Sequence, residues 1–337
     1  MRMKARGVVR LKPATSMVCL VSSVAAILLS AMSFAADKNP EPVSHADVDV
    51  GAARIHEPIQ PVPVKYSFDA QKVDLGNRLF HDRRLAGDRH LACADCHNLD
   101  IGGTDKLAFS LKGNGEATQF NTPTIFNVSL NTQYYWSGKF LTLEDQIDDA
   151  LKEINTTWPA LIRTINAIPG YVARFNALYA DGVTAANIQD AIVHFEQSLL
   201  TPNSDFDRYL NGDHSALSRN ALQGYRLFKS YGCITCHQGK NVGGNFLLNV
   251  DKAGPPFGKL SSIHDRLKNK LKYIRVPSLR NVAVTAPYFH DGSATTLYQA
   301  VHRMIDEYLG INVKDEEIYY IVSFLKSLTG EYKGKKL

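Results

Sequence analysis

The chain has 337 residues, of which 45% are hydrophobic and 21% are charged. This composition excludes global disorder, and the length exceeds what one small core serves, so we expect two domains. The formal net charge of +5 equals the contribution of five basic residues within the first 12 positions, which precede every acidic residue. The remaining chain is neutral overall, which gives a nucleic-acid partner no electrostatic support.

Residues 1–35 have the pattern of an export signal. A basic segment precedes the apolar or small residues 17–29, and residues 33–35 fit a small-x-small cleavage site. The alternative is a retained membrane anchor, but the apolar stretch is short and interrupted by serine. We therefore expect a periplasmic protein with no membrane span after cleavage. Residues 36–65, with the proline-rich stretch 58–63, are expected to form an extended N-terminal arm.

Two short motifs contain all four cysteines that remain after signal cleavage. They are Cys93-Ala94-Asp95-Cys96-His97 and Cys233-Ile234-Thr235-Cys236-His237. The pattern C-x-x-C-H attaches c-type haem, because its two thiols add to the haem vinyl groups. The histidine that follows is then held at the iron as the proximal ligand.

Paired cysteines also occur in four-cysteine zinc sites, redox-active pairs and disulfides. Such a zinc site has roughly 15–20 residues between its pairs, whereas 136 residues separate Cys96 from Cys233. A thioredoxin-like pair needs a βαβ context, which the sequence does not show. The two motifs therefore predict two covalently bound haem c groups and no structural disulfide.

An internal repeat surrounds the two motifs. The pattern G-x-R-L-F occurs at residues 76–80, before the first motif, and at residues 224–228, before the second. Downstream, residues 123–150 align without a gap on residues 277–304. A third block aligns residues 192–199 with residues 321–328, and both copies have helical periodicity. Thr184 is a suitable N-cap for the first of these two helices.

The repeat predicts an all-α fold with long loops, built from two tandem class I cytochrome c-like domains that each hold one haem. The expected domains are residues 66–203 and residues 204–337. Their joint is expected at residues 201–204, a cluster of polar turn-forming residues.

The repeat also shows where the two haem sites differ. Met304 is the one methionine of the mature chain, 67 residues after His237, and Ala150 stands at the equivalent position of the first copy. A thioether ligand gives a low-spin haem of high potential, whereas alanine cannot ligate iron. We therefore expect Met304 to ligate the His237 haem, although packing in a core is the alternative role for a helical methionine.

The first haem is expected to have an open coordination position. Residues 98–193 contain no histidine, methionine or cysteine. Two tyrosines, Tyr134 and Tyr135, remain as other candidates for the iron of the His97 haem.

From about residue 66 to 330 the chain resembles the bacterial di-haem cytochrome c peroxidases, the superfamily that also contains MauG. The matching stretches are NTPT (121–124), YWSG (135–138), TLEDQ (142–146), TPNSDFDRY (201–209), VPSLRNV (276–282) and TAPYFHDG (285–292). The resemblance implies that the N-terminal haem reacts with peroxide and that the C-terminal haem accepts electrons.

The resemblance also implies roles for individual residues. Met304 matches the axial methionine, and Trp136 matches the tryptophan between the haems, although large aromatic residues more often simply pack. Gln146 and Glu153 match residues that line the peroxide pocket, Glu153 if a three-residue deletion is allowed. A solvated helical glutamate is the alternative for Glu153.

The family's interdomain calcium site matches the side chain of Asn121 and the carbonyl groups of Thr285 and Pro287, which are hard oxygen ligands.

One feature departs from the family. Many members have a distal histidine before the N-x-P-T stretch, but here residues 110–116 offer glycine and asparagine instead. This difference argues against activation by release of a histidine and brings the chain closer to MauG-like enzymes.

The favoured interpretation is a cytochrome c peroxidase that reduces hydrogen peroxide to water with electrons from a small cytochrome c or cupredoxin. Glu153 would move the proton between the peroxide oxygens. The alternatives are a MauG-like enzyme that oxidises aromatic side chains of a partner protein and a di-haem electron carrier. The basic run 266–275 is expected to be a solvated face or a docking surface for an acidic partner. The sequence leaves open whether the chain forms a homodimer.

Overall fold

The computed structural model describes residues 57–64, 67–87, 89–250 and 271–337, and their contacts place them in one compact unit. The expected signal, most of the N-terminal arm and residues 266–270 of the basic run lie outside these residues. Within the described ranges, no helix has the length and apolar character needed to cross a membrane.

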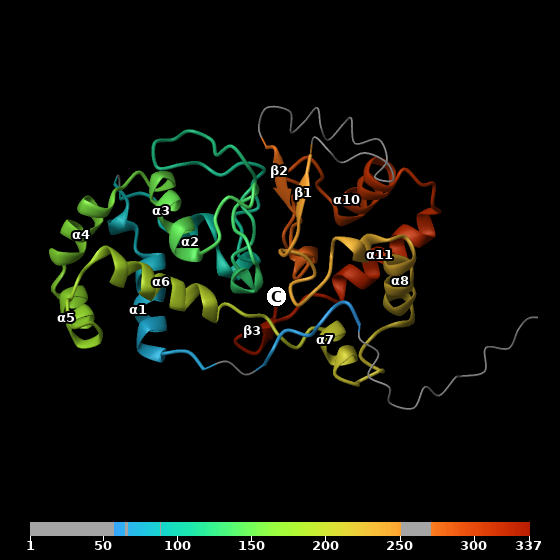
Figure 1. Ribbon diagram of the computed structural model, residues 1–337, viewed down its shortest axis with the longest axis horizontal. Coiled ribbons are helices and arrows are strands. Elements are labelled where there is room, and N and C mark those ends of the chain that lie inside the picture. Colours follow the sequence, from blue (N-terminus) through green and yellow to red (C-terminus); the bar gives the residue numbers. More distant parts are fainter. Residues whose placement is uncertain (1–56, 65–66, 88, 251–270) are drawn as a thin grey trace, which may run out of the picture. The chain divides into compact units, whose positions relative to one another are not determined.

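The N-terminal half consists of helices joined by long loops (Figure 1). These are α1 (Ala70–His81), the 3₁₀ turn η1 (Arg83–Leu85), α2 (Cys93–Cys96), η2 (Leu99–Ile101), η3 (Val128–Leu130), α3 (Leu143–Glu153), α4 (Trp158–Asn166), α5 (Pro169–Leu178) and α6 (Ala185–Ser198). Several helices begin at capping side chains, as at Thr184, whose hydroxyl accepts a hydrogen bond from the Asn187 amide at 3.2 Å. The N-cap predicted for α6 is thereby confirmed.

The C-terminal half repeats this order with additions. It contains α7 (Asp205–Leu210), α8 (Arg219–Ser230), η4 (Cys233–Thr235), β1 (Leu247–Asn249), β2 (Tyr273–Arg275), η5 (Val282–Val284), α10 (Leu297–Arg303), the π-helical turn η6 (Met304–Leu309), α11 (Asp315–Lys326), β3 (Glu331–Tyr332) and β4 (Lys335–Lys336). Strands β1 and β2 pair antiparallel, as do β3 and β4. The helical prediction holds for most of the described chain, and these two- and three-residue strands are too short to show an alternating pattern in sequence.

Two helix pairs, α1 with α6 and α8 with α11, are built alike (Figure 1). The glycine of each G-x-R-L-F motif lies against a backbone carbonyl of its partner helix. A Cβ on Gly76 would lie 1.9 Å from the Ala191 oxygen, and one on Gly224 would lie 1.8 Å from the Tyr320 oxygen. Only glycine permits this close approach, so the repeated glycine sets the spacing of both pairs.

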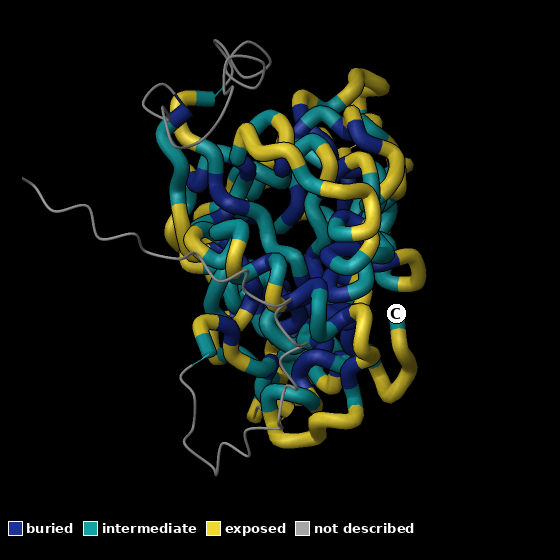
Figure 2. Tube along the Cα trace, turned by 90° about the vertical axis from the view of Figure 1, so that its right-hand side faces the viewer, coloured by how far each residue is buried: buried dark blue, intermediate teal, exposed yellow. Residues whose placement is uncertain are grey.

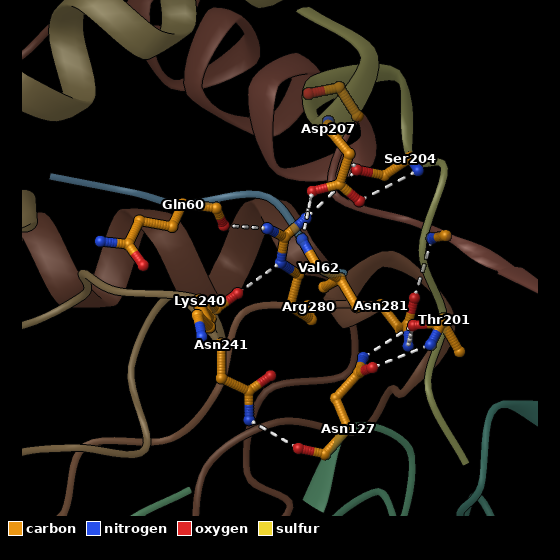
Figure 3. Close-up of polar contacts among 12 residues, drawn as sticks. Gln60, Val62, Asn127, Thr201, Ser204, Asp207, Lys240, Asn241, Arg280 and Asn281 are labelled. Atoms are coloured by element: carbon orange, nitrogen blue, oxygen red, sulfur yellow. Dashed lines mark hydrogen bonds and ion pairs between the residues drawn. The ribbon is translucent and has the colours of Figure 1, made fainter. Parts of the chain in front are cut away.

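The repeat extends to backbone hydrogen bonds. Asn127 and Asn281 both adopt left-handed conformations, and their amides donate to the carbonyls of Leu199 and Leu328. The hydroxyl of Thr201 accepts hydrogen bonds from both asparagine side chains, at 2.7 Å and 2.9 Å (Figure 3). Thr201 and Ser204, at the two ends of the expected joint, are buried, and both halves bond to the Thr201 side chain.

Buried hydrophobic side chains form separate clusters in the two halves. Two clusters draw on residues 75–199, and a third draws on residues 206–328 together with Ile59. Figure 2 shows buried segments enclosed by partly buried and exposed loops. The described end of the N-terminal arm thus contributes to the core of the C-terminal half.

A buried ion pair also holds this arm. Arg280 and Asp207 lie 2.7 Å apart, and their side chains are 1% and 2% exposed. Arg280 donates to the carbonyl of Gln60, and the amide of Val62 donates to Asp207 (Figure 3). Because each charge has a counter-charge and further hydrogen bonds, its burial is compensated.

Candidate functional site

The second C-x-x-C-H motif opens into a cavity of about 260 Å³. The walls include Cys233, Cys236, His237 and Met304, and most of the remaining lining is apolar. Met304 stands at the end of α10, where the helix continues as a π-helical turn. The structure thus brings the one methionine of the expected mature chain into the cavity that contains the second motif's histidine.

His237 is buried, and its Nδ1 atom has no hydrogen-bond partner among the described residues. Burial lowers the pKa of His237 to about 4, so the imidazole is neutral at neutral pH and retains a lone pair for a metal. Phe228 packs near this ring, with the ring centres 6.4 Å apart. Two thiols, a neutral imidazole and a thioether around an apolar cavity fit a c-type haem.

The first motif has the same local design. Its cysteines form the short helix α2, and the His97 amide donates to the Cys93 carbonyl at 2.9 Å. The His97 Nδ1 atom lies 3.4 Å from the Gly103 carbonyl, and the Phe80 ring centre lies 6.4 Å from the imidazole. Burial lowers the pKa of His97, so this imidazole is also neutral. The donors again fit a haem.

The four cysteines are free thiols in the structure. Burial raises the pKa of Cys93 to about 12 and that of both Cys96 and Cys233 to about 11, and it raises the pKa of Cys236 as well. These shifts reflect the apolar surroundings of both motifs.

Glu153 ends helix α3, and its side chain is 42% exposed. Its carboxylate lies 3.6 Å from the Lys112 ammonium group, and its carbonyl accepts a hydrogen bond from Gly113. Residues 110–116, where many family members have a distal histidine, therefore contact Glu153. Its negative charge is the smallest of the causes, after burial and the charges of Asp105 and Asp95, that raise the pKa of Cys96, and after burial it also raises the pKa of Tyr135.

Gln146 and Ala150 lie on the same helix as Glu153 and are partly buried. Their repeat equivalents, Ala300 and Met304, both line the cavity of the second motif. By this equivalence, Gln146 and Ala150 are expected to face the first C-x-x-C-H motif.

Trp136 is buried and lies in the wall of the second cavity, although it belongs to the N-terminal half. Its indole nitrogen donates to the Asn121 carbonyl at 2.8 Å, and its ring meets His290 edge-on at 6.3 Å. His290 in turn lies 6.1 Å from the ring of Phe120. Trp136 therefore joins side chains of both halves at the cavity.

The residues matched to the calcium site, Asn121, Thr285 and Pro287, lie in the walls of this same cavity. The Asn121 side-chain nitrogen donates to the Leu107 carbonyl at 2.7 Å. No three His, Cys, Asp or Glu side chains gather as a metal site within the described ranges. A cation held here would depend on amide and carbonyl oxygens.

Arg275 corrects one expectation from the sequence. It was assigned to a solvated basic run, but it is only 5% exposed and lies in the cavity wall. Its amide donates to the Trp136 carbonyl at 2.8 Å, its Nε atom donates to the Tyr135 carbonyl at 3.1 Å, and burial lowers its pKa to about 10. Pairing of β2 with β1 turns this side chain inward, which a run of charged residues does not reveal.

Comparison with known proteins gives consistent similarities. The sequence model described as di-haem cytochrome c peroxidase matches residues 70–215. The chain is 38% identical to the cytochrome c peroxidase Ccp of Escherichia coli K12, across 86% of this chain and 64% of that protein. It is 36% identical to the cytochrome c551 peroxidase of Nitrosomonas europaea, across 85% and 88% of the two chains.

A solved structure is also similar. The crystal structure of a MauG-like protein associated with microbial copper homeostasis superimposes with a TM-score of 0.68 at 25% identity, covering 82% of this chain and 94% of that one. The described chain and this protein therefore share a mostly helical fold. The chain spans just under two thirds of the length of the E. coli relative.

Proposed function

Because the chain belongs to the di-haem cytochrome c peroxidase family, we propose that it reduces hydrogen peroxide to water with electrons from another redox protein. Each reaction consumes one peroxide, two electrons and two protons and yields two waters. One observation carries the assignment of the two sites. Met304 lies in the cavity of the second motif, whereas its equivalent in the first half is Ala150.

The haems, when bound, supply the redox chemistry, and the chain holds and differentiates them. Each motif offers two thiols for attachment and a neutral imidazole for the iron. Met304 would hold the iron of a haem at the C-terminal site through its thioether, which would suit electron transfer. The N-terminal site lacks a methionine at this position, which leaves room for peroxide.

Glu153 is the proposed proton carrier. It accepts a proton from one peroxide oxygen and donates it to the other, so that the leaving oxygen departs as water. Contact with Lys112 and Gly113 fixes the end of α3 against residues 110–116, and Gln146 on the same helix orients the peroxide. These roles follow from the family resemblance and are supported by the contacts of Glu153 with Lys112 and Gly113.

Trp136 lies where electrons pass from the second site to the first. Its hydrogen bond to Asn121 and the two bonds from Arg275 to residues 135 and 136 hold the indole in the cavity wall. The buried Arg275 cation also offers a counter-charge to the carboxylates of a haem at this site. A small cytochrome c or cupredoxin is the proposed electron donor.

Two further assignments belong to this proposal. The signal-like residues 1–35 direct the chain to the periplasm. Calcium binds Asn121, Thr285 and Pro287 beside Trp136, where a chelator would remove it. Loss of calcium would then change electron transfer to the first site, measured as the rate of its reduction with and without chelator.

A peroxide titration of the fully oxidised and the half-reduced protein, followed by optical spectroscopy, tests the function. We expect the spectrum of the first haem to change in the fully oxidised protein, because residues 98–193 provide no histidine, methionine or cysteine to block the iron. Reaction only after one-electron reduction would indicate another blocking group, with Tyr134 and Tyr135 as candidates. A protein silent in both states would be an electron carrier.

A MauG-like activity is the second candidate. It is favoured by residues 110–116, which contain glycine and asparagine and contact Glu153 in place of offering a distal histidine. Met304 argues against it by the resemblance, since MauG uses a tyrosine at its second haem. Peroxide-dependent oxidation of aromatic residues in a partner protein, with no turnover of a small cytochrome, would favour this activity.

A further inference from the structure

Glu196 is a buried acid that the proposed peroxidase mechanism does not use. It lies on α6, it is 5% exposed, and its Oε2 atom has no hydrogen-bond partner among the described residues. An unpaired buried carboxylate is costly, so such a group is held in its protonated form unless a positive charge lies nearby. Burial, with a further contribution from Glu144, raises the pKa of Glu196 to about 8.

The surroundings of Glu196 place it beside the first haem motif. Cys93 packs against the hydrophobic cluster that contains Phe195, the residue before Glu196 on α6. When ionised, Glu196 adds to the effect of burial in raising the pKa of the Cys93 thiol and that of Tyr134. Cys93 is one of the two attachment points of the first haem. The carboxyl group of Glu196 therefore lies within electrostatic range of that haem.

The internal repeat locates Glu196 independently. Its equivalent in the second half is Leu325, one turn after Ile321, and both line the cavity that contains His237 and Met304. Glu196 and Ile192 hold the same positions on α6, against the first motif. A carboxyl group thus stands in the first site where the second site has an apolar side chain.

Other titratable groups near Glu196 are few among the described residues. Glu144 of α3 adds negative charge, and Cys93 and Tyr134 are the neighbouring weak acids. His81 of α1 packs near Phe195, the neighbour of Glu196, with the ring centres 6.1 Å apart. The Nδ1 atom of His81 lies 2.8 Å from the Asn77 carbonyl oxygen.

Charges farther along α6 are paired with one another. Asp190 bonds to Lys72 and lies 3.4 Å from His194. The charge of Arg275 opposes the effect of burial on the pKa of Tyr134, which is raised overall. None of these residues forms a hydrogen bond with the Glu196 side chain.

We propose that Glu196 is a proton-binding group of the first haem site, which takes up a proton from solvent when that site gains an electron. This proposal rests on the proposed function only in requiring a redox-active haem at Cys93 and Cys96. Gain of one electron removes one positive charge from the site, so the carboxylate binds a proton more tightly. Loss of the electron releases the same proton, and charge stays balanced in the buried site.

The sign of the pH dependence follows from this coupling. At low pH Glu196 is protonated in both redox states, and the reduction potential does not change with pH. Between the pKa of the oxidised site and that of the reduced site, reduction takes up a proton, so the potential falls as the pH rises. The equilibrium constant for reduction then falls by up to about tenfold per pH unit.

Redox titrations of the two-haem protein test the proposal. They are carried out from low pH to above the pKa of Glu196 in the reduced site, and the two haems are resolved by their optical spectra. We expect the first haem's potential to fall with rising pH in the parent protein. In Glu196→Gln, which keeps the shape of the side chain, and in Glu196→Leu, which copies the second half, the potential should be independent of pH. An unchanged pH dependence in both variants would overturn the proposal.

An infrared difference spectrum of the parent protein, reduced minus oxidised, guards against variants that lose haem. The carbonyl stretch of a protonated carboxylic acid should appear on reduction and be absent in Glu196→Gln. Its absence in the parent protein contradicts the proposal. These measurements need no peroxide, so a failed peroxidase assignment would leave their outcome unaffected.

Discussion

The two halves of the chain attach haem through the same motif, yet the side chains around the motifs differ systematically. The second half places Met304, Ala300 and Leu325 in its cavity. The equivalent residues of the first half are Ala150, Gln146 and Glu196. In the proposed function, the thioether and apolar walls of the second site suit electron exchange, and the polar groups of the first site suit proton handling. A duplicated fold thus yields different chemistry through a few substitutions on matching helices.

Replacing Met304 tests the largest difference between the halves. In Met304→His the second haem should stay low-spin, but its potential should fall by a few tenths of a volt, because imidazole favours oxidised iron more than a thioether does. Spectroelectrochemical titration measures this shift. Potentials equal to those of the parent protein would show that Met304 only packs.

The reciprocal change, Ala150→Met, moves the thioether to the first half. We expect a low-spin first haem and a much slower reaction with peroxide, since the incoming ligand occupies the open position. A first haem with an unchanged spectrum and rate would mean that position 150 does not face the iron.

Replacing Glu153 tests the proton-handling character of the first half. Glu153→Gln should keep peroxide binding but lower the rate on the order of 10²–10⁴-fold, because general acid–base catalysis is lost. Stopped-flow mixing of the oxidised protein with peroxide measures both steps. Asp145→Asn, at an exposed residue of the same helix, is the matched control and should react at nearly the parent rate. Equal rates for Glu153→Gln and the parent would assign the proton transfer elsewhere.

A third difference concerns stability. Arg280 of the buried ion pair is equivalent to Phe126, which is equally buried in the first half. Arg280→Met should lower the free energy of unfolding by about 3–5 kcal/mol, because Asp207 remains as an unpaired buried charge. Denaturant unfolding measures the loss. Much of the lost free energy of unfolding should be recovered when Asp207→Asn is added to Arg280→Met. If none is recovered, the loss comes mainly from the hydrogen bonds of Arg280 and not from the unpaired charge of Asp207.

The glycines of the repeated motif should behave alike, which makes them a test of structural equivalence. Gly76→Ala and Gly224→Ala should each lower stability by about 1–3 kcal/mol, since the added methyl group meets a backbone carbonyl. Gly170→Ala is the control, because an added Cβ would meet nothing within 4 Å. Thermal unfolding of the three variants compares them. Stable variants at both motif positions would show that the helix pairs separate easily.

Much of this organisation is readable from the sequence, because it depends on local patterns. The haem motifs, the aligned blocks and the N-cap at Thr184 each lie within a few residues. Glu196 and Arg275 are different, since an isolated Glu or Arg in a sequence is ordinarily solvent-exposed. Their burial results from packing of distant segments, α6 against α3 and β2 against β1, and no local pattern records it.

The joint between the halves shows the same limit. Residues 201–204 are polar turn-forming residues, which predict a break between two helices. The same residues are equally typical of an exposed linker. In the structure Thr201 and Ser204 are buried. The asparagines that bond Thr201 come from positions 74 and 80 residues away. Hydrogen bonds between residues this far apart depend on the tertiary fold. In the sequence, only the repetition of Asn127 at Asn281 indicated that these asparagines have a structural role.

The hydroxyl of Thr201, which bonds both halves, restricts where the chain can be divided into separate fragments. A fragment that ends before this residue would leave the Asn127 amide without its acceptor, and a fragment that begins after it would do the same to Asn281. The N-terminal arm adds to this, because Gln60 and Val62 bond to Arg280 and Asp207 of the opposite half. We therefore expect a fragment that holds one copy to be less stable than the full chain.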